Sequence, residues 1–500
     1  MLKPASLFTD SAVLCRRKEI RVFGEVSEGL TVTVRLFSRD GFLLGENSAP
    51  AEGLRFLVTL PPQEAQTGCR LVIRAGKEQA EANNVAVGEV FLAGGQSNME
   101  VELRNADEGP DIIRQYDDPL LRFFNVPKIA VKGPEHRKAN DAARWQAVTP
   151  GCGGVNSAVA YFFAAKLRQN MPDIPIGIIG CYWGGTSITC WMDEKTLRTD
   201  PEGLRYLEEY EVLTAGKSME TWLEEESRFQ ETFGAWCTAV DRYKQSHPGA
   251  PWPEINDACG AAPWNPPPGP GSPYRPAGLA ETMVREVLPV TLSGILFYQG
   301  EEDAGKTDHY DQLLTLLIRT WRSWFKTPDL PFLFVQLPMW ADPAAGETFR
   351  WAMLRRAQAA VRDSVPGAGM ICLLDQGEYG NIHPTAKRPV GERLAELAGA
   401  MLYGGGEVSP RALDLTSRGD ALSIRLSAPV QLRGETAALL EVAGADRHYA
   451  PARAEVLGDR LLLHADGMKQ PVHARYAWTD YAPSVPFFGA NNLPLEPCDR

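Results

Sequence analysis

The sequence predicts an α/β protein with a mostly parallel sheet, helices on both faces of that sheet, and an all-β unit at each end of the chain. Short apolar strands alternate with helical stretches in the middle of the chain, which is typical of a parallel sheet between two helical layers. The expected strands are at 90–93, 174–179, 294–298, 332–337 and 370–374. The expected helices are at 159–169, 310–324, 353–362 and 390–402. We therefore expect a three-layer α/β/α core.

Both ends of the chain are predicted to be antiparallel β-structure. Residues 17–87 contain short alternating strands separated by Gly, Pro, Ser and Asn, which is the pattern of a β-sandwich. The same pattern returns after residue 405, with expected strands at 422–426, 438–442, 460–464 and 474–478. The predicted domains are an N-terminal β-sandwich at 1–87, the α/β domain at 88–404 and a C-terminal β domain at 405–500.

Residues 200–285 interrupt the alternation of strands and helices. A charged helical stretch at 201–246 is followed by a run rich in proline and glycine at 263–276, which can be neither helix nor central strand. This run is either a plain connection or a stiff insertion that forms one wall of the ligand site. The sequence leaves both readings open.

Composition and charge narrow the class of function. The chain has 500 residues, 44% of them hydrophobic and 23% charged, and a formal net charge of −12. A nucleic-acid-binding protein would carry a basic face, and no dense run of Lys and Arg supplies one. We expect neither a secretory signal nor a membrane-spanning helix, since no segment has the apolar pattern of either, and the cysteines are scattered singly. We therefore expect a cytoplasmic protein with reduced thiols and no zinc site.

A serine follows the first apolar strand of the central part. The segment Gly-Gly-Gln-Ser-Asn-Met at 94–99 places Ser97 directly after the strand at 90–93. A serine on such a strand-to-helix turn lies at the edge of the sheet, where backbone N–H groups can hold an oxyanion. The segment is not the G-x-S-x-G pattern of the α/β-hydrolases. Taken alone, a serine in a turn is more often structural than catalytic.

His383 is the one histidine expected at a strand end of the α/β part. It stands in Asn-Ile-His-Pro-Thr-Ala-Lys at 381–387, between the strand at 370–374 and the helix at 390–402. An imidazole with a pKa near 6.5 suits the role of base for a serine hydroxyl. The placement makes this role about as probable as a purely structural one.

Two further motifs follow apolar strands. Phe-Tyr-Gln-Gly-Glu-Glu-Asp at 297–303 offers the amide of Gln299 as an oxyanion donor and acids that could orient a base. Cys-Tyr-Trp-Gly-Gly-Thr-Ser at 181–187 offers backbone N–H groups and an indole. A solvated acidic loop and a tightly packed corner are the structural alternatives. Because ligands bind beyond the carboxyl ends of parallel strands, we expect all these motifs at one edge of the sheet.

Taken together and in this order, the motifs resemble the sialate O-acetylesterase family, a carbohydrate-esterase branch of the SGNH hydrolases. The order is Gly-Gln-Ser-Asn-Met, Asn-Ser-Ala-Val-Ala-Tyr-Phe-Phe at 156–163, Trp-Gly-Gly-Thr, Tyr-Gln-Gly-Glu and Ile-His-Pro. The resemblance covers nearly the whole chain, the segment at 200–275 least well. It implies an SGNH, flavodoxin-like core and a serine esterase without metal or cofactor. Its expected substrates are acetylated carbohydrates, either sialic acid or plant oligosaccharides.

Carried over residue by residue, the resemblance makes Ser97 the nucleophile and His383 its general base. The backbone N–H of Ser97 and the side chain of Gln299 would form part of the oxyanion hole, with Gly154 as a further donor. SGNH enzymes commonly place an aspartate three residues before the histidine, where this chain has Gly380.

The acid partner of the histidine is therefore open. The pair could work as a Ser–His dyad oriented by a backbone carbonyl. Otherwise an acid could come from position 375, position 378 or the loop at 301–303, and Asp375 and Glu302 are the favoured candidates.

Two other functions fit the same sequence. One is a non-catalytic carbohydrate-binding protein with a degenerate hydrolase core, and the other is a different SGNH esterase of lipase-like activity. Several tryptophans in expected pocket loops could stack on a sugar or be packed in the core: Trp183, Trp191, Trp252, Trp264 and Trp340. Arg275 and Arg350 are the candidate partners of a sialic-acid carboxylate.

Overall fold

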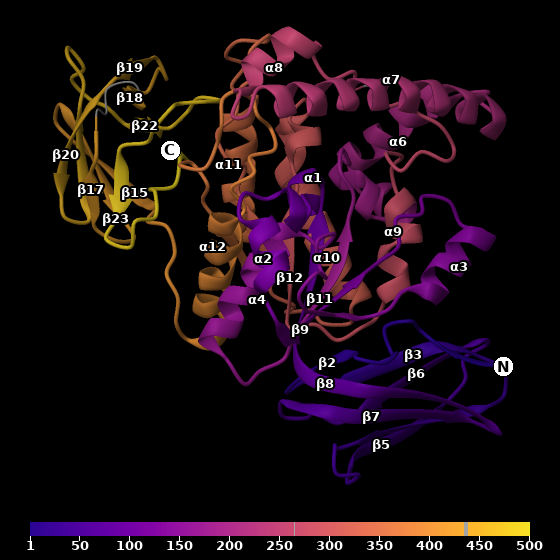
Figure 1. The fold of residues 1–500 in the computed structure, drawn as a ribbon. Coiled ribbons are helices and arrows are strands. Elements are labelled where there is room, and N and C mark those ends of the chain that lie inside the picture. The colour runs from indigo at the N-terminus through magenta and orange to yellow at the C-terminus, as the bar shows by residue number, and fades with distance from the viewer. Residues whose placement is uncertain (265, 435–438) are drawn as a thin grey trace.

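The computed structural model describes residues 1–264, 266–434 and 439–500. Its centre is a mostly parallel sheet with helices on both faces, and a β-rich unit lies at each end of the chain (Figure 1). The predicted α/β class with flanking β-structure is confirmed. Two predicted segments touch residues outside the described ranges: Asn265 in the run at 263–276, and Ala438 in the strand expected at 438–442.

The central sheet has the strand order β10–β9–β11–β8–β12–β13–β14. Its strands are β8 (Glu78–Gly95), β9 (Asp118–Asn125), β10 (Gln146–Val148), β11 (Ile176–Tyr182), β12 (Gly294–Tyr298), β13 (Phe332–Val335) and β14 (Ala368–Ile371). Each neighbouring pair is parallel, except β10 with β9. Every residue of β11, β12 and β13 is buried, because helices cover both faces of the sheet.

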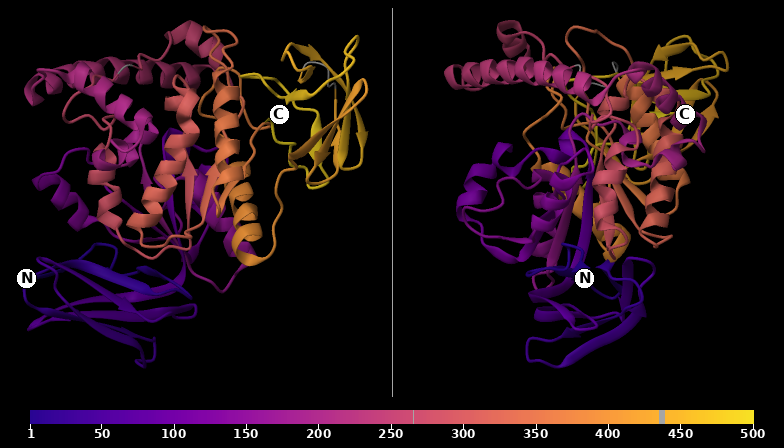
Figure 2. Two further views of the ribbon diagram at one scale, coloured as in Figure 1. Left: turned by 180° about the vertical axis from the view of Figure 1, so that it is seen from behind. Right: turned by 90° about the vertical axis from the view of Figure 1, so that its right-hand side faces the viewer.

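The helices form a layer on each side of this sheet (Figure 2). They are α1 (Ser97–Glu100), α2 (Gly109–Gln115), α3 (Pro134–Ala142), α4 (Ala158–Asn170), α5 (Glu194–Leu197), α9 (Gly278–Thr282), α10 (Tyr310–Trp324), α11 (Arg350–Ser364) and α12 (Arg388–Ala398). Helices α4 and α12 pack closely, and a Cβ on Gly391 of α12 would lie 2.6 Å from the carbonyl oxygen of Val159 on α4. Within the described residues, no helix is both long and apolar enough to cross a membrane.

The N-terminal unit consists of two sheets, antiparallel except for the parallel pair β2–β8, that meet the central sheet through one shared strand. Its strands are β1 (Leu2–Pro4), β2 (Val13–Cys15), β3 (Ile20–Val26), β4 (Thr31–Phe37), β5 (Leu43–Pro50), β6 (Arg55–Leu60) and β7 (Gln66–Ala75). Strands β5, β4 and β7 continue into β8, which then runs on as a central strand. The expected boundary between residues 87 and 88 therefore lies inside a continuous strand.

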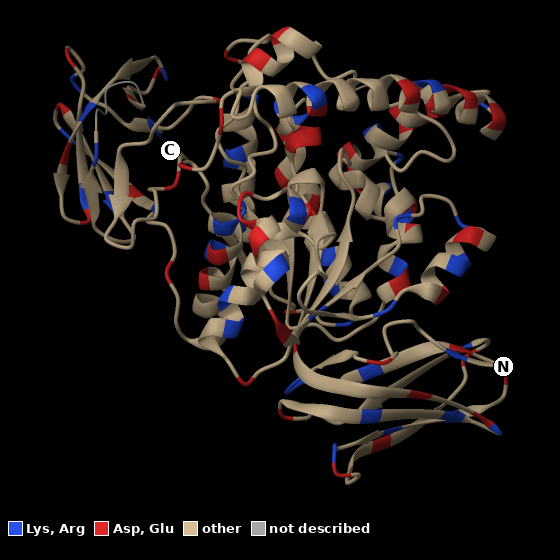
Figure 3. Ribbon diagram, in the orientation of Figure 1, with Lys and Arg blue, Asp and Glu red and all other residues tan. Residues whose placement is uncertain are grey.

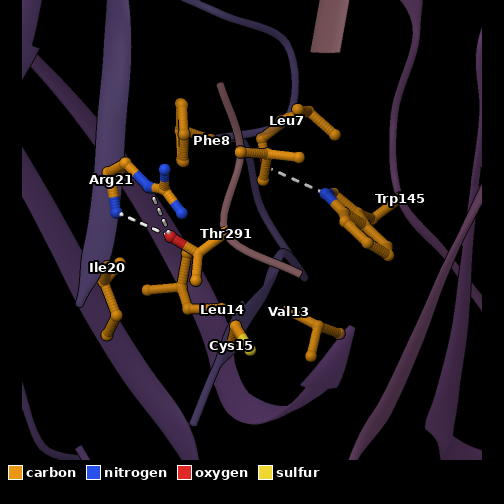
Figure 4. A pocket seen from close by; sticks show the side chains of 10 residues that line it. Leu7, Phe8, Val13, Leu14, Cys15, Ile20, Arg21, Trp145 and Thr291 are labelled. Atoms are coloured by element: carbon orange, nitrogen blue, oxygen red, sulfur yellow. Dashed lines mark hydrogen bonds between the residues drawn. The ribbon is translucent and has the colours of Figure 1, made fainter. Parts of the chain in front are cut away.

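A small pocket lies where the N-terminal unit meets the α/β part (Figure 4). The backbone N–H and Nε of Arg21 donate to Thr291 Oγ1 at 3.3 and 3.2 Å, and Trp145 Nε1 donates to the carbonyl of Leu7 at 2.9 Å. Burial raises the pKa of the Cys15 thiol beside them to about 11. With a volume of about 10 Å³ the pocket has room for one water molecule, so it is a packing feature of this junction.

The C-terminal unit is all-β and shares its core with the α/β part. Its strands are β15 (Ala412–Arg418), β16 (Ala421–Leu426), β17 (Val430–Leu432), β18 (Leu440–Ala443), β19 (Tyr449–Pro451), β20 (Arg453–Leu457), β21 (Arg460–His464), β22 (His473–Tyr476), β23 (Phe487–Gly489) and β24 (Cys498–Asp499). Met339, Cys372 and Leu374 of the α/β part belong to the same buried apolar cluster as these strands. The unit is thus packed firmly onto the α/β part.

The predicted helical stretch at 201–246 is split into α6 (Pro201–Thr214) and α7 (Met219–Ser246), and α8 (Trp252–Cys259) follows. The break contains Gly216 at a φ of 73°, and Ser218 caps α7 by accepting the N–H of Thr221. Helix α7 carries both acidic and basic residues and crosses the molecule on the same side as α1 (Figures 1 and 3). The insertion therefore covers the edge of the sheet where the motifs lie.

Candidate active site

The turn that carries Ser97 is built by a close approach of two strands. Gly95 ends β8 at a φ of 128°, and a Cβ there would lie 2.1 Å from the carbonyl oxygen of Tyr298 on β12. Only glycine fits this position. Gln96 donates its N–H to that same carbonyl at 2.9 Å, and Ser97 begins α1. Because Ser97 is the first residue of the helix, its backbone N–H has no carbonyl partner within the helix.

Ser97 and His383 meet at this edge of the sheet. Nε2 of His383 lies 2.8 Å from Oγ of Ser97, although 286 positions separate the two residues. The His383 backbone N–H donates to Oδ1 of Asn381 at 3.1 Å, and Nδ2 of Asn381 donates to Glu378 at 2.7 Å. The hydroxyl and the imidazole are within direct proton-transfer distance.

The environment of His383 favours the neutral imidazole. Desolvation by the surrounding protein lowers the pKa of His383 to about 4, and the charge of the Lys387 ammonium acts in the same direction. Part of the residue remains exposed to solvent. At neutral pH the side chain is therefore an unprotonated base that solvent can reach.

Within the described residues, no carboxylate forms a hydrogen bond with the imidazole of His383. Asp375 instead makes a two-bond ion pair with Arg393, with both distances 2.6 Å. Glu302 lies in the short helix after β12, where its backbone N–H donates to Oε1 of Gln96 at 3.3 Å. The structure thus brings Ser97 and His383 together and pairs Asp375 with Arg393, and among the described residues the Glu302 carboxylate forms no hydrogen bond with His383.

Gln299 lies beneath the serine turn and faces the interior. Gln299 is 1% exposed, and its Nε2 donates to Asp303 at 2.5 Å and to Gln96 at 3.1 Å. Its Oε1 accepts the hydroxyl of Tyr310 at 2.8 Å. With two amide hydrogens already used, Gln299 has none left for an oxyanion in this arrangement. This inward orientation differs from the expectation drawn from the sequence.

Gln96 is a functional candidate that the sequence reasoning missed. Its Oε1 accepts from Gln299 Nε2 at 3.1 Å, from the N–H of Gly300 at 3.2 Å and from the N–H of Glu302 at 3.3 Å. These donors fix the orientation of the amide, and its Nε2 forms no hydrogen bond within the described residues. The signal in the sequence was its position directly before Ser97 in the Gly-Gln-Ser-Asn segment.

Asn98 ties the serine turn to the histidine loop. Its Nδ2 donates to Glu301 at 2.6 Å and to the carbonyl of Ile382 at 2.9 Å, while its Oδ1 accepts from Nζ of Lys387 at 2.5 Å. Burial lowers the pKa of Lys387 to about 8, although the Glu301 carboxylate opposes this change. We call Asn98, Glu301 and Lys387 the polar clamp. It links the neighbours of Ser97 and His383 through buried contacts.

The glycine packed on the serine is Gly184 of the Trp-Gly-Gly-Thr motif. A Cβ on Gly184 would lie 3.2 Å from Cβ of Ser97, and its N–H donates to Glu100 at 2.5 Å. Gly154, the expected oxyanion donor, is half-buried in the loop before α4, where its carbonyl accepts the N–H of Arg104 at 3.1 Å. No contact between Gly154 and Ser97 is found among the described residues.

The run rich in proline and glycine forms a wall beside the serine. A Cβ on Gly185 would lie 2.1 Å from Cζ2 of Trp264, so this tryptophan packs directly on the motif that covers Ser97. Trp264 is 40% exposed and meets the rings of Phe229 and Phe233 on α7 edge-on. Of the two readings of this run, the insertion that walls the site agrees with these contacts.

The other residues that were expected to bind a sugar lie in different parts of the molecule. Trp191 is fully buried, and Trp340 packs against Trp351 with ring centroids 4.7 Å apart and the rings tilted by 45°. Trp183 is half-buried beneath the ammonium of Lys128, which lies 4.9 Å from the ring centroid. On the outer helices, Nζ of Lys244 lies 4.2 Å from the ring centroid of Trp252. Of the two candidate arginines, Arg275 donates to a backbone carbonyl at 3.3 Å, and Arg350 is exposed at the start of α11.

Known proteins resemble this chain in sequence and in fold. Residues 264–399 match the family described as carbohydrate esterase, sialic acid-specific acetylesterase. The sialate O-acetylesterase of Mus musculus is 23% identical over 521 residues, which cover 95% of this chain and 90% of that protein. The human sialate O-acetylesterase (Homo sapiens) is 22% identical over 499 residues, with coverages of 92% and 84%.

A solved structure supports the same relationship. The crystal structure of a carbohydrate acetylesterase from Xanthomonas citri covers 100% of this chain with a TM-score of 0.76 and 27% identity, and the match spans 99% of that protein. The predicted likeness to the sialate O-acetylesterase family is confirmed. This chain is an esterase related to the sialate O-acetylesterases. In this esterase the family match at 264–399 includes Gln299 and His383, whereas Ser97 lies in the part covered by the full-length relatives.

Proposed function

We propose that the protein is a carbohydrate O-acetylesterase in which Ser97 is the nucleophile and His383 the general base. The observation that carries this proposal is the 2.8 Å distance between Oγ of Ser97 and Nε2 of His383. A serine beside a neutral imidazole at the end of a parallel strand is the arrangement that nucleophilic ester hydrolysis needs.

In the first step, Oγ of Ser97 attacks the acetyl carbonyl while Nε2 of His383 takes its proton. The negative charge that develops on the carbonyl oxygen is held by the backbone N–H of Ser97 and by Nε2 of Gln96. The intermediate then collapses, His383 returns the proton to the departing sugar oxygen, and the sugar leaves as an alcohol. The acetyl group remains as an ester on Ser97.

In the second step, His383 removes a proton from water, and the resulting nucleophile attacks the acetyl-enzyme. Collapse of this second intermediate releases acetate and returns the proton to Oγ of Ser97. Gln299 acts in both steps by holding Gln96, and a contribution of Gly154 to the oxyanion hole stays a prediction.

We favour a Ser–His dyad over a triad completed by Asp375 or Glu302. Asp375 is occupied by its ion pair with Arg393, and the Glu302 backbone binds the serine turn on the side of Gln96. The loop contacts through Asn381 and the polar clamp hold the imidazole in place. A low pKa weakens the imidazole as a base, and the negative charge of the adjacent oxyanion offsets this during the reaction.

The substrate class follows from the wall of the site. The exposed indole of Trp264 supports stacking against a sugar ring next to Ser97. Acetylated sialic acid and acetylated plant oligosaccharides are the candidate substrates, and a sialic-acid carboxylate would use Arg275 or Arg350. The cytoplasmic location stays a prediction.

Acetate release from acetylated sialic acids and from acetylated xylan and xyloglucan oligosaccharides tests the proposal. Ser97→Ala and His383→Ala should abolish release, whereas His247→Ala, on an exposed histidine at the end of α7, should not change it. Equal activity of Ser97→Ala and the unmodified protein would refute the assignment. Faster hydrolysis of octanoyl than of acetyl esters would favour a lipase-like enzyme, and binding without hydrolysis would favour a carbohydrate-binding protein.

A further inference from the structure

A second cavity lies where the start of α11 meets the C-terminal β-unit. Its volume is about 450 Å³, which is within the range of small-molecule sites, roughly 300–1,000 Å³. Phe349 and Met353 line it from the α11 side, and Glu441, Arg475 and Trp478 line it from the β-unit. We call it the junction cavity, and none of these residues belongs to the Ser97 site.

Aromatic rings and an ion-paired guanidinium group form one side of the junction cavity. The guanidinium of Arg475 lies 3.9 Å from the ring centroid of Tyr449 and 4.6 Å from that of Trp478. Nε of Arg475 also donates to Asp499 at 3.0 Å. Asp499 also binds Nη1 of Arg356 at 3.0 Å, and the Arg356 guanidinium lies 5.3 Å from the ring centroid of Trp478. This side therefore offers N–H donors and an indole, with one carboxylate shared by two guanidinium groups.

A free acceptor lies next to these donors. Glu441 on β18 is the direct cross-strand neighbour of Arg475 on β22, and its carboxylate has no hydrogen-bond or ion-pair partner within the described residues. Glu347 is used differently, since it binds the hydroxyl of Thr479 and accepts the N–H of Asp480 at 2.9 Å. The carboxylate of Glu347 is therefore held by protein groups, while that of Glu441 remains available to a ligand.

Phe349 is an exposed aromatic residue in a strained backbone conformation. It is 44% exposed and has a φ of 59°, a region that bulky side chains rarely occupy. Its N–H is held by Oε1 of Glu347 at 3.1 Å. Backbone strain of this kind concentrates at functional sites, where surrounding contacts maintain it. Here it presents a phenyl ring at the edge of the cavity.

We propose that the junction cavity is a second carbohydrate site, which binds a neutral sugar unit of an oligosaccharide. Apolar faces of a sugar ring pack on Trp478 and Phe349, and its hydroxyls donate to Glu441 and accept from Arg475. An anionic ligand is disfavoured because three carboxylates, those of Glu441, Glu347 and Asp499, stand against only two guanidinium groups, those of Arg475 and Arg356. The choice of a sugar as ligand rests on the proposed function of the Ser97 site.

The junction cavity and the esterase site share a structural support in α11. Met353 lines the cavity, and Thr307 beside the esterase site donates its hydroxyl to Sδ of Met353 at 3.8 Å. The adjacent Leu354 packs on Gly300, where a Cβ would lie 2.8 Å from its side chain. A glycan bound in the cavity would therefore be anchored to the helix that buttresses the motif at 297–303.

Isothermal titration calorimetry with the full-length protein tests the second site. The probes are unacetylated cellohexaose, xylohexaose and mannohexaose, which the esterase cannot consume. We expect at least one hexasaccharide to bind, Trp478→Ala and Glu441→Gln to weaken that binding at least tenfold, and Phe42→Ala, on an exposed phenylalanine of the N-terminal unit, to leave it unchanged. Hydrolysis of p-nitrophenyl acetate should stay unchanged in these variants.

The outcomes separate the second site from the esterase proposal. Binding that persists in Ser97→Ala and is lost in Glu441→Gln supports the second site whether or not the protein hydrolyses acetyl esters. Absence of binding by all three hexasaccharides, or full binding by Glu441→Gln, would overturn it. Glu441→Gln changes only the charge of a half-buried surface carboxylate, so it remains decisive if Trp478→Ala does not fold.

Discussion

The pH dependence of acetate release gives the sharpest test of the site. In the folded protein, desolvation and Lys387 lower the pKa of His383 to about 4, whereas an unperturbed imidazole titrates near 6.5. At pH 5 a base with a pKa of about 4 is about 90% neutral, and one with a pKa near 6.5 is about 3% neutral. The fraction of His383 that is neutral at pH 5 is therefore expected to be about 30-fold higher than for an ordinary histidine.

The assay is kcat/KM for an uncharged acetylated sugar between pH 3.5 and 8, with acetate measured enzymatically and folding checked by circular dichroism at each pH. We expect an acidic limb with its midpoint near 4. Lys387→Gln, which keeps a donor for Asn98 and removes the positive charge, should move that midpoint upward. A midpoint between 6 and 7 in the unmodified protein would refute the argument that the imidazole is desolvated.

Three further predictions concern the neighbours of the dyad. Gln96→Ala should lower kcat about 10²–10³-fold with little change in KM, as loss of one oxyanion donor does; an unchanged kcat would remove Gln96 from the oxyanion hole. Asn98→Ala should lower kcat and cost about 1–3 kcal/mol of unfolding free energy in urea, because Lys387 and Glu301 lose a buried partner; full stability would contradict the polar clamp. Asp375→Asn should change kcat only a few-fold if the dyad is complete, whereas a triad acid would cost about 10⁴-fold.

The meeting of Ser97 and His383 could be predicted from the sequence because both follow strands of one parallel sheet. The carboxyl ends of such strands lie at one edge, so the topology alone brings the two motifs together. Helix α10 was predicted at its observed bounds because its apolar residues recur with helical period. Strand β9 was missed because Pro119 and Arg122 interrupt its apolar run.

The orientation of Gln299 could not be predicted, since it depends on partners that are distant in sequence or turned inward by tertiary packing. Asp303 and Tyr310 are fully buried and bind the two ends of the Gln299 amide. Asp303 is held in turn by the loop at 186–188, and the helix that begins with Tyr310 packs on α11. A motif shows which residue types are present at a strand end. Which of them face the ligand is decided by the buried hydrogen bonds, and here these use both amide hydrogens of Gln299 and leave Nε2 of Gln96 without a hydrogen bond among the described residues.

In the proposed dyad, His383 has no carboxylate partner within the described residues and needs another source of orientation. In this protein the loop itself supplies it, through Asn381 on one side and the Asn98 contact with Ile382 on the other. A carboxylate would also raise the pKa of the imidazole, and its absence leaves His383 neutral over most of the accessible pH range. The positive charge of Lys387 reinforces this state. The polar clamp thus positions the base and contributes charge to the site, and for this reason Lys387→Gln should change the pH profile and the rate together.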